Sequence, residues 1–128
     1  MEFLGHYCTF EHKVDSHPES DPVHVHHFDS MKDGPHLLIL SGIHAGTERI
    51  PTAAAHTAIE MLNNGMLPLT RGEITIIPMC NPLALKQGKR FVDVNLNRIM
   101  HRHGDPTLYE HYLANIITYY MDRADAVI

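Results

Sequence analysis

The chain has 128 residues, 44% of them hydrophobic and 20% charged, which suffices for one domain with a buried core and argues against disorder. With 10 lysines and arginines against 15 aspartates and glutamates, the formal net charge is −5, and the scattered basic residues argue against a nucleic-acid partner. The longest aliphatic run covers only residues 37–40, and residues 1–6 lack a secretory signal, so we expect a cytoplasmic protein with no membrane partner.

Strands are expected in the first third of the chain. Residues 3–13 and 22–28 have β-type composition and flank a polar segment, which predicts an antiparallel hairpin. Residues 37–40 form an apolar run without alternation, which is typical of a central strand covered on both faces.

A helix and a second buried strand follow. Apolar residues at helical spacing run from Ala54 to Leu62, with Pro51 near the expected start and Gly65 placed to end the helix. Residues 73–79 then have the composition of another buried strand. This order predicts a right-handed crossover between two parallel strands.

The last part of the chain combines a long loop, a helix and a short strand. Residues 81–100 show no regular pattern, and loops of this length are uncommon unless they are functional. Asp105 and Pro106 are typical of a helix start. The inner face of that helix is expected to carry Tyr109, Leu113, Ile116, Ile117 and Tyr120. Residues 126–128 resemble the opening of a further interior strand.

Together these elements predict an α/β fold with a mainly parallel, mixed sheet, an N-terminal antiparallel hairpin and flanking helices. We expect residues 1–128 to form a single domain that is incomplete at its C-terminus. A sheet that stops at residues 127–128 would leave an open edge, which predicts a homodimer formed through that edge.

The first candidate site lies just after the first central strand. Ligands bind beyond the carboxyl ends of parallel strands, and the segment 41–49 offers the imidazole of His44 and the carboxylate of Glu48, a pairing that suits zinc. Alternatively, His44 is an ordinary loop histidine and Glu48 a helix-start acid that interacts with the helix dipole. A phosphate loop is disfavoured, because Glu48 would place negative charge at the phosphate and no lysine follows the second glycine.

A second cluster lies in the long loop. Residues 90–98 hold two arginines, Arg90 and Arg98, and two asparagines, Asn95 and Asn97. Guanidinium groups bind carboxylates through two parallel hydrogen bonds, so the segment could receive an anionic substrate. The alternative is that these arginines are solvated surface residues.

The two clusters together carry a family resemblance. Residues 36–128 resemble the succinylglutamate desuccinylase/aspartoacylase family of the zinc carboxypeptidase superfamily. The matching stretches are 41–44 followed by Glu48, then 78–82, and then Arg90 to Arg98, and their order and spacing fit as well.

The resemblance implies a zinc-dependent hydrolase of carboxypeptidase-like fold that cleaves an amide bond of a small carboxylate-bearing substrate or peptide C-terminus. By position, His44 and Glu48 resemble metal ligands, and Arg90 resembles the arginine that polarises the scissile carbonyl. Asn97 and Arg98 resemble the pair that holds the substrate carboxylate.

Some positions differ from the family pattern. His44 and Glu48 are four positions apart, whereas the family has three, and Asn95 stands where the family has an aspartate. The family's third ligand, a histidine, and its general-base glutamate follow a strand that resembles residues 125–128, so the chain ends before both. A noncatalytic metal- or carboxylate-binding module, or an inactive fragment of such an enzyme, therefore remains an alternative.

Histidine is the commonest metal-binding side chain, and the chain carries 12 histidines but only two isolated cysteines. His24 and His26 are two apart on an expected strand and share a face, with His27 opposite. His101 and His103 follow the arginine-containing loop. Such pairs fall short of the usual ligand count, and His101 or His103 is the candidate substitute for the third ligand.

Overall fold

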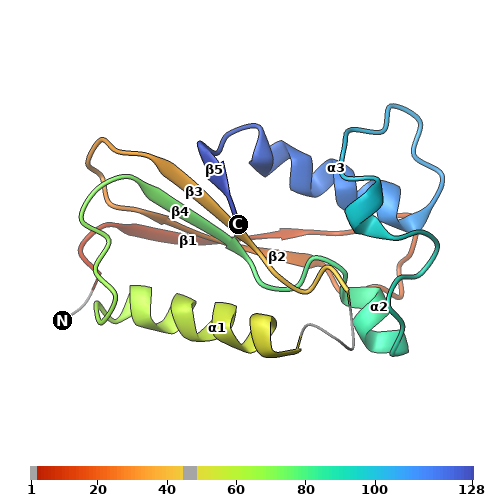
Figure 1. Cartoon of the computed structure of the whole chain (residues 1–128), viewed down its shortest axis with the longest axis horizontal. Coiled ribbons are helices and arrows are strands. Elements are labelled where there is room, and N and C mark those ends of the chain that lie inside the picture. Colours follow the sequence, from red (N-terminus) through yellow and green to blue (C-terminus); the bar gives the residue numbers. More distant parts are fainter. Residues whose placement is uncertain (1–2, 45–48) are drawn as a thin grey trace.

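The computed structural model describes residues 3–44 and 49–128. In chain order the elements are β1 (His6–His12), β2 (Val23–Asp29), β3 (His36–Leu40), α1 (Arg49–Asn63), β4 (Glu73–Ile77), α2 (Pro82–Gln87), the 3-10 helix η1 (Leu96–Arg98), α3 (Tyr109–Met121) and β5 (Ala126–Val127). The strands form one five-stranded sheet in the order β1-β2-β4-β3-β5. Helix α1 covers one face of this sheet and α3 the other (Figure 1).

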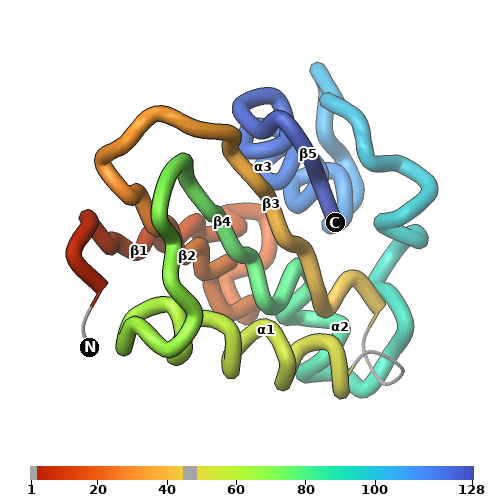
Figure 2. The backbone as a smooth tube through the Cα atoms, turned by 60° about the vertical axis from the view of Figure 1, so that its left-hand side comes forward, coloured from red at the N-terminus to blue at the C-terminus, as the bar shows by residue number. Residues whose placement is uncertain are grey.

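The sheet is mixed, as the sequence predicts. Strands β1 and β2 form the expected antiparallel hairpin, and β2 continues antiparallel onto β4. Strand β3 pairs in parallel with both β4 and β5, so the crossover through α1 joins neighbouring parallel strands. Figure 2 shows β5 beside β3, with the C-terminus at the end of this strand. The predicted fold class is therefore confirmed, whereas self-association through the β5 edge stays a prediction.

Alternation along the strands divides the interior into two cores. In β4, Ile76 packs toward α1 and the next residue, Ile77, packs toward α3. The α3 side also buries Val23, Val25, Leu38, Leu113 and Ile117, and the α1 side buries Phe28, Ile59 and Leu62. Because both faces of the sheet are covered, the apolar runs without alternation are explained.

Two boundary predictions are wrong. Residues 81–100 are not one irregular loop, since they contain α2 and η1. Helix α2 begins after Asn81, whose side chain accepts a hydrogen bond from the Ala84 amide at 3.2 Å, and ends at Gly88 in the left-handed conformation. Six residues are too few for helical periodicity to be visible in the sequence.

The helix expected from Asp105 and Pro106 begins only at Tyr109. Asp105 does not accept the hydrogen bonds of the first backbone amides of this helix. Asp93 Oδ2 accepts from the Tyr109 amide at 2.8 Å, and His111 Nδ1 accepts from the Leu108 amide at 3.2 Å. A cap supplied by a distant loop gives no local sequence signal, which explains the error. None of the described helices is long and apolar enough to cross a membrane.

His26 lies on the α1 side of β2 and makes the stability of the fold depend on pH. Its Nδ1 atom is 2.8 Å from the Tyr7 hydroxyl, and the two rings stack. Burial lowers the pKa of His26 below its ordinary value of 6.5, and His56 and His24 lower it further. The folded chain therefore resists a proton that the unfolded chain binds.

We expect the free energy of unfolding to fall as the pH decreases through the ordinary histidine pKa of 6.5, because the unfolded state then binds more protons than the folded state. Replacement His26→Gln should make this dependence shallower. Urea unfolding at a series of pH values would measure it, with His6→Gln on an exposed position of β1 as the control. An unchanged pH dependence in His26→Gln would contradict this assignment.

Candidate metal and substrate site

The carboxyl ends of β3 and β4 build the base of the site. Beyond the strands, Ser41 Oγ donates to the Pro78 carbonyl at 2.6 Å, and the Cys80 amide donates to the Ser41 carbonyl at 3.0 Å. The Asn81 amide donates to the Gly42 carbonyl at 3.0 Å. The segments after β3 and β4 thus remain hydrogen-bonded to one another beyond the sheet. His44 follows at the edge where open α/β sheets bind ligands.

The orientation of His44 is set by Asn95. The Asn95 Oδ1 atom accepts from the Asn97 amide at 3.1 Å, which identifies this atom as the oxygen of the side-chain amide. The same oxygen lies 2.7 Å from His44 Nε2. Because an amide oxygen only accepts, Nε2 is the donor, and in the neutral form of the ring Nδ1 is then the nitrogen with the lone pair that a metal ion needs.

This contact joins the two clusters that the sequence singles out. Asn95 is also the N-cap of η1, the short helix that holds Asn97 and Arg98. A metal-binding histidine commonly donates its other ring proton to an acceptor that fixes its tautomer. Asn95 accepts the ring proton of His44 with an amide oxygen at the position where the family has an aspartate, so this difference keeps a hydrogen-bond acceptor there.

The other predicted site residues are three exposed side chains and the proposed ligand Glu48. Arg90, Asn97 and Arg98 are exposed, and in the described part of the chain no acceptor takes a hydrogen bond from their side chains, so their donors face solvent. The predicted ligand Glu48 lies outside the described residues. The structure therefore brings His44 to the segment that leads into η1.

The loop that leads to Asn95 is held by one buried carboxylate, which sequence reasoning missed. Glu110 is 0% exposed. Its Oε2 atom accepts from Asn81 Nδ2 at 2.9 Å and from the Val92 amide at 2.7 Å. Its Oε1 atom accepts from the Asp93 amide at 2.8 Å and from the Val94 amide at 3.0 Å.

These four hydrogen bonds satisfy the carboxylate of Glu110, which forms no ion pair with a lysine or arginine among residues 3–44 and 49–128. They also tie the loop from β4, the segment before η1 and the first turn of α3 to one point. A signal was present in the sequence, because Glu110 lies three positions before Leu113 and seven before Ile117, on the inner face of the helix.

The suggested substitute ligands, His101 and His103, have partners of their own in the structure. The ring centroids of His101 and His103 are 4.1 Å apart. His103 also stacks on His111, with ring centroids 4.2 Å apart. His103 Nε2 lies 2.8 Å from the Ile99 carbonyl. In residues 3–44 and 49–128, the only group of three side chains with metal-binding spacing is at a different place, at His27, Asp29 and Glu73.

The sheet order, the two covering helices and the site at the carboxyl ends of β3 and β4 define a carboxypeptidase-like α/β protein. A family model described as the succinylglutamate desuccinylase/aspartoacylase catalytic domain matches residues 33–117, and the chain belongs to this family. No curated protein sequence gives a significant match to the chain.

Solved structures agree with this fold. An aspartoacylase family protein from Mesorhizobium loti matches with a TM-score of 0.75 at 23% identity, over 97% of this chain and 40% of its own. A succinylglutamate desuccinylase from a Silicibacter species matches with a TM-score of 0.71 at 19% identity, over 95% and 37%. Carboxypeptidase A from Helicoverpa armigera matches with a TM-score of 0.70 at 13% identity, over 95% and 39%. The chain thus spans about two fifths of the length of these proteins.

Proposed function

We propose that this chain supplies the first two zinc ligands and the substrate-binding loop of a zinc-dependent hydrolase that cleaves an amide bond of a small carboxylate-bearing substrate. The ligands would be His44 and Glu48. The hydrogen bond between His44 Nε2 and Asn95 Oδ1, at 2.7 Å, is the observation that carries the proposal. It uses Nε2 as the donor, which leaves Nδ1 as the nitrogen that would bind the metal ion, and it joins His44 to the loop expected to bind substrate.

The residues present fit zinc, because an oriented neutral imidazole and a carboxylate belong to the donor set of catalytic zinc sites. Zinc bound here would supply a water molecule of lowered pKa as the nucleophile. His44 would contribute the lone pair of Nδ1, and the hydrogen bond to Asn95 keeps the ring proton on Nε2.

The exposed cations would act on the substrate. Arg98 and the amide of Asn97 lie on η1 and offer donors for a substrate carboxylate. Arg90 would stabilise the negative charge that develops on the scissile carbonyl oxygen. Glu110 acts indirectly, because it fixes the backbone at residues 92–94 that lies between these donors.

Zinc titration of the metal-free chain by calorimetry tests the ligand assignment. We expect His44→Ala to weaken binding at this site at least about tenfold, because a ligand nitrogen is lost. His24→Ala, which removes an exposed histidine of β2, is the matched control and should leave this site unchanged. Equal binding by wild type and His44→Ala would reject the site.

Hydrolysis of N-acyl amino acids, with and without a chelator, tests the activity of the complete protein to which this chain contributes. Turnover that a chelator does not reduce would reject the zinc mechanism. Zinc binding at His44 without turnover would favour a noncatalytic metal-binding module instead.

A further inference from the structure

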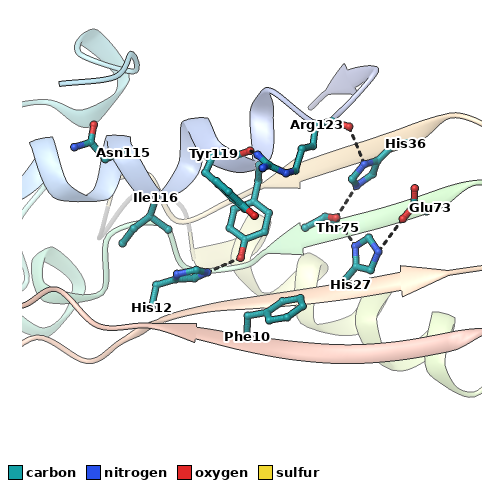
Figure 3. Close-up of a pocket in the computed structure, with 11 residues that line it drawn as sticks. Phe10, His12, His27, His36, Glu73, Thr75, Asn115, Ile116, Tyr119 and Arg123 are labelled. Carbon is teal, nitrogen blue, oxygen red and sulfur yellow. Dashed lines mark hydrogen bonds and ion pairs between the residues drawn. The ribbon is translucent and has the colours of Figure 1, made fainter. Parts of the chain in front are cut away.

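Three side chains with metal-binding spacing meet at the opposite end of β4 from the proposed active site. Asp29, the last residue of β2, pairs with Glu73, the first residue of β4, and His27 pairs with Thr75. His27 and Asp29 are two apart on β2, so they share one face of the sheet. Figure 3 shows His27 and Glu73 on the face that α3 covers, beside Thr75 and His36.

The spacing of the three groups suits a small divalent ion. One ligand atom from each of His27, Asp29 and Glu73 lies within 4.8 Å of the others, and His27 Nε2 is 3.0 Å from Glu73 Oε1. Ligands on tetrahedral zinc with bonds of about 2.0–2.1 Å are roughly 3.3 Å apart. The histidine and the glutamate are close to this separation, and a carboxylate oxygen of Asp29 lies within 4.8 Å of both ligand atoms.

A hydrogen-bond chain fixes which nitrogen of His27 faces Glu73. The hydrogen bonds run from the Arg123 carbonyl through His36 and Thr75 to His27. The Arg123 carbonyl can only accept, so His36 Nδ1 donates to it at 3.0 Å. With His36 neutral, its Nε2 atom then accepts from the Thr75 hydroxyl at 2.7 Å. Since Thr75 has one proton to give, its oxygen must accept from His27 Nδ1 at 2.8 Å.

With the hydrogen bonds in this direction, His27 Nε2 and a carboxylate oxygen of Glu73 face one another as two acceptors. With Nδ1 as the donor, the Nε2 atom of neutral His27 presents a lone pair to the carboxylate of Glu73 at 3.0 Å. Two lone pairs at this distance require a proton or a metal ion between them. The chain through Thr75 and His36 is also the outer arrangement that orients metal-binding histidines in proteins.

The local charge favours a cation as well. The carboxylates of Asp29 and Glu73 lie on directly paired positions, where like charges repel. Among the described residues, no lysine or arginine forms an ion pair with either group, and the ion pair that Glu73 makes is with His27. Asp29 Oδ1 accepts from the Met31 amide at 2.8 Å, which holds this carboxylate in place.

Solvent reaches the cluster from two sides. A cavity of about 790 Å³ between the sheet and α3 is lined by His27 and Glu73, and also by Phe10, Tyr119 and Arg123. A smaller cavity of about 310 Å³ is lined by Asp29 and Glu73. An ion can therefore enter, and its fourth coordination position can hold water.

We propose that His27, Asp29 and Glu73 form a second metal site, for a divalent transition-metal ion of the zinc class, at the edge of the sheet where β2 meets β4. The site has a nitrogen and two carboxylate ligands and one open position toward the larger cavity. It shares no residue with the proposed active site, so the two inferences can fail separately.

Cobalt(II) titration of the metal-free His44→Ala chain tests the site, because the first site is removed and tetrahedral cobalt absorbs visible light. We expect one Co²⁺ per chain with a visible d–d band. Asp29→Asn should weaken this binding at least about tenfold, because the ligand charge is lost while Oδ1 can still accept from Met31. Glu73→Gln should have the same effect.

His24→Gln is the matched control, because His24 lies on the other face of β2 and forms an ion pair with Glu11, at 3.5 Å. It should bind Co²⁺ like the His44→Ala parent. The site is rejected if the parent binds no Co²⁺ at micromolar concentration, if both Asp29→Asn and Glu73→Gln bind normally, or if His24→Gln loses as much affinity as they do. Zinc binding that His44→Ala leaves unchanged would instead count against the proposed active site.

Discussion

Replacement Glu110→Gln is expected to lower the free energy of unfolding by about 3 kcal/mol. The carboxylate accepts four hydrogen bonds in a fully buried position. A glutamine keeps one acceptor oxygen and turns an NH₂ group toward backbone amides that are themselves donors. At least one partly buried backbone amide, at Val92 or at Asp93 and Val94, then loses its partner.

Urea denaturation measures this effect, and Glu60→Gln is the matched control because Glu60 is exposed on α1. The control should change stability by less than about 0.5 kcal/mol. Zinc affinity supplies a second readout, since residues 92–94 lead directly to Asn95 and hence to His44. A Glu110→Gln chain as stable as wild type would contradict the function of this carboxylate as the anchor of the loop.

The strands and the two long helices could be predicted because their apolar spacing is a local property. Residues 37–40 and 73–79 lack alternation, and both strands are covered by a helix on each face. The start of α3 could not be predicted in the same way. Its first amide is received by Asp93, which lies 16 positions earlier in the chain.

In the candidate sites, too, local features could be predicted and contacts between distant segments could not. His44, Asn97 and Arg98 could be selected from their residue types and from their positions after a strand and in a loop. The anchoring by Glu110 and Asn81 depends on how α3 packs against the loop after β4. The group of His27, Asp29 and Glu73 depends on β2 pairing with β4 and not with β3, and sheet order does not follow from the spacing of residues along the chain.

Replacement Gly42→Ala is expected to destabilise the chain by about 3 kcal/mol. Gly42 has a φ of +68°, in the left-handed region that disfavours residues with a Cβ atom. The added Cβ would also lie 2.8 Å from Met79 Sδ and 2.9 Å from the Pro78 carbonyl oxygen. Relief of these contacts requires movement of the segment that follows β4, so the two costs add.

Gly88→Ala separates the two costs, because Gly88 has nearly the same φ of +67° and an added Cβ there would meet nothing within 4 Å. This control should lose only about 1–2 kcal/mol, the cost of the left-handed conformation. The additional loss in Gly42→Ala, measured by urea denaturation, is then the cost of displacing Met79 and Pro78. Since the Gly42 carbonyl accepts from the Asn81 amide at 3.0 Å, zinc affinity at His44 should fall in Gly42→Ala and not in Gly88→Ala. Equal losses of stability in the two variants would show that the close approach of the segments after β3 and β4 does not constrain the site.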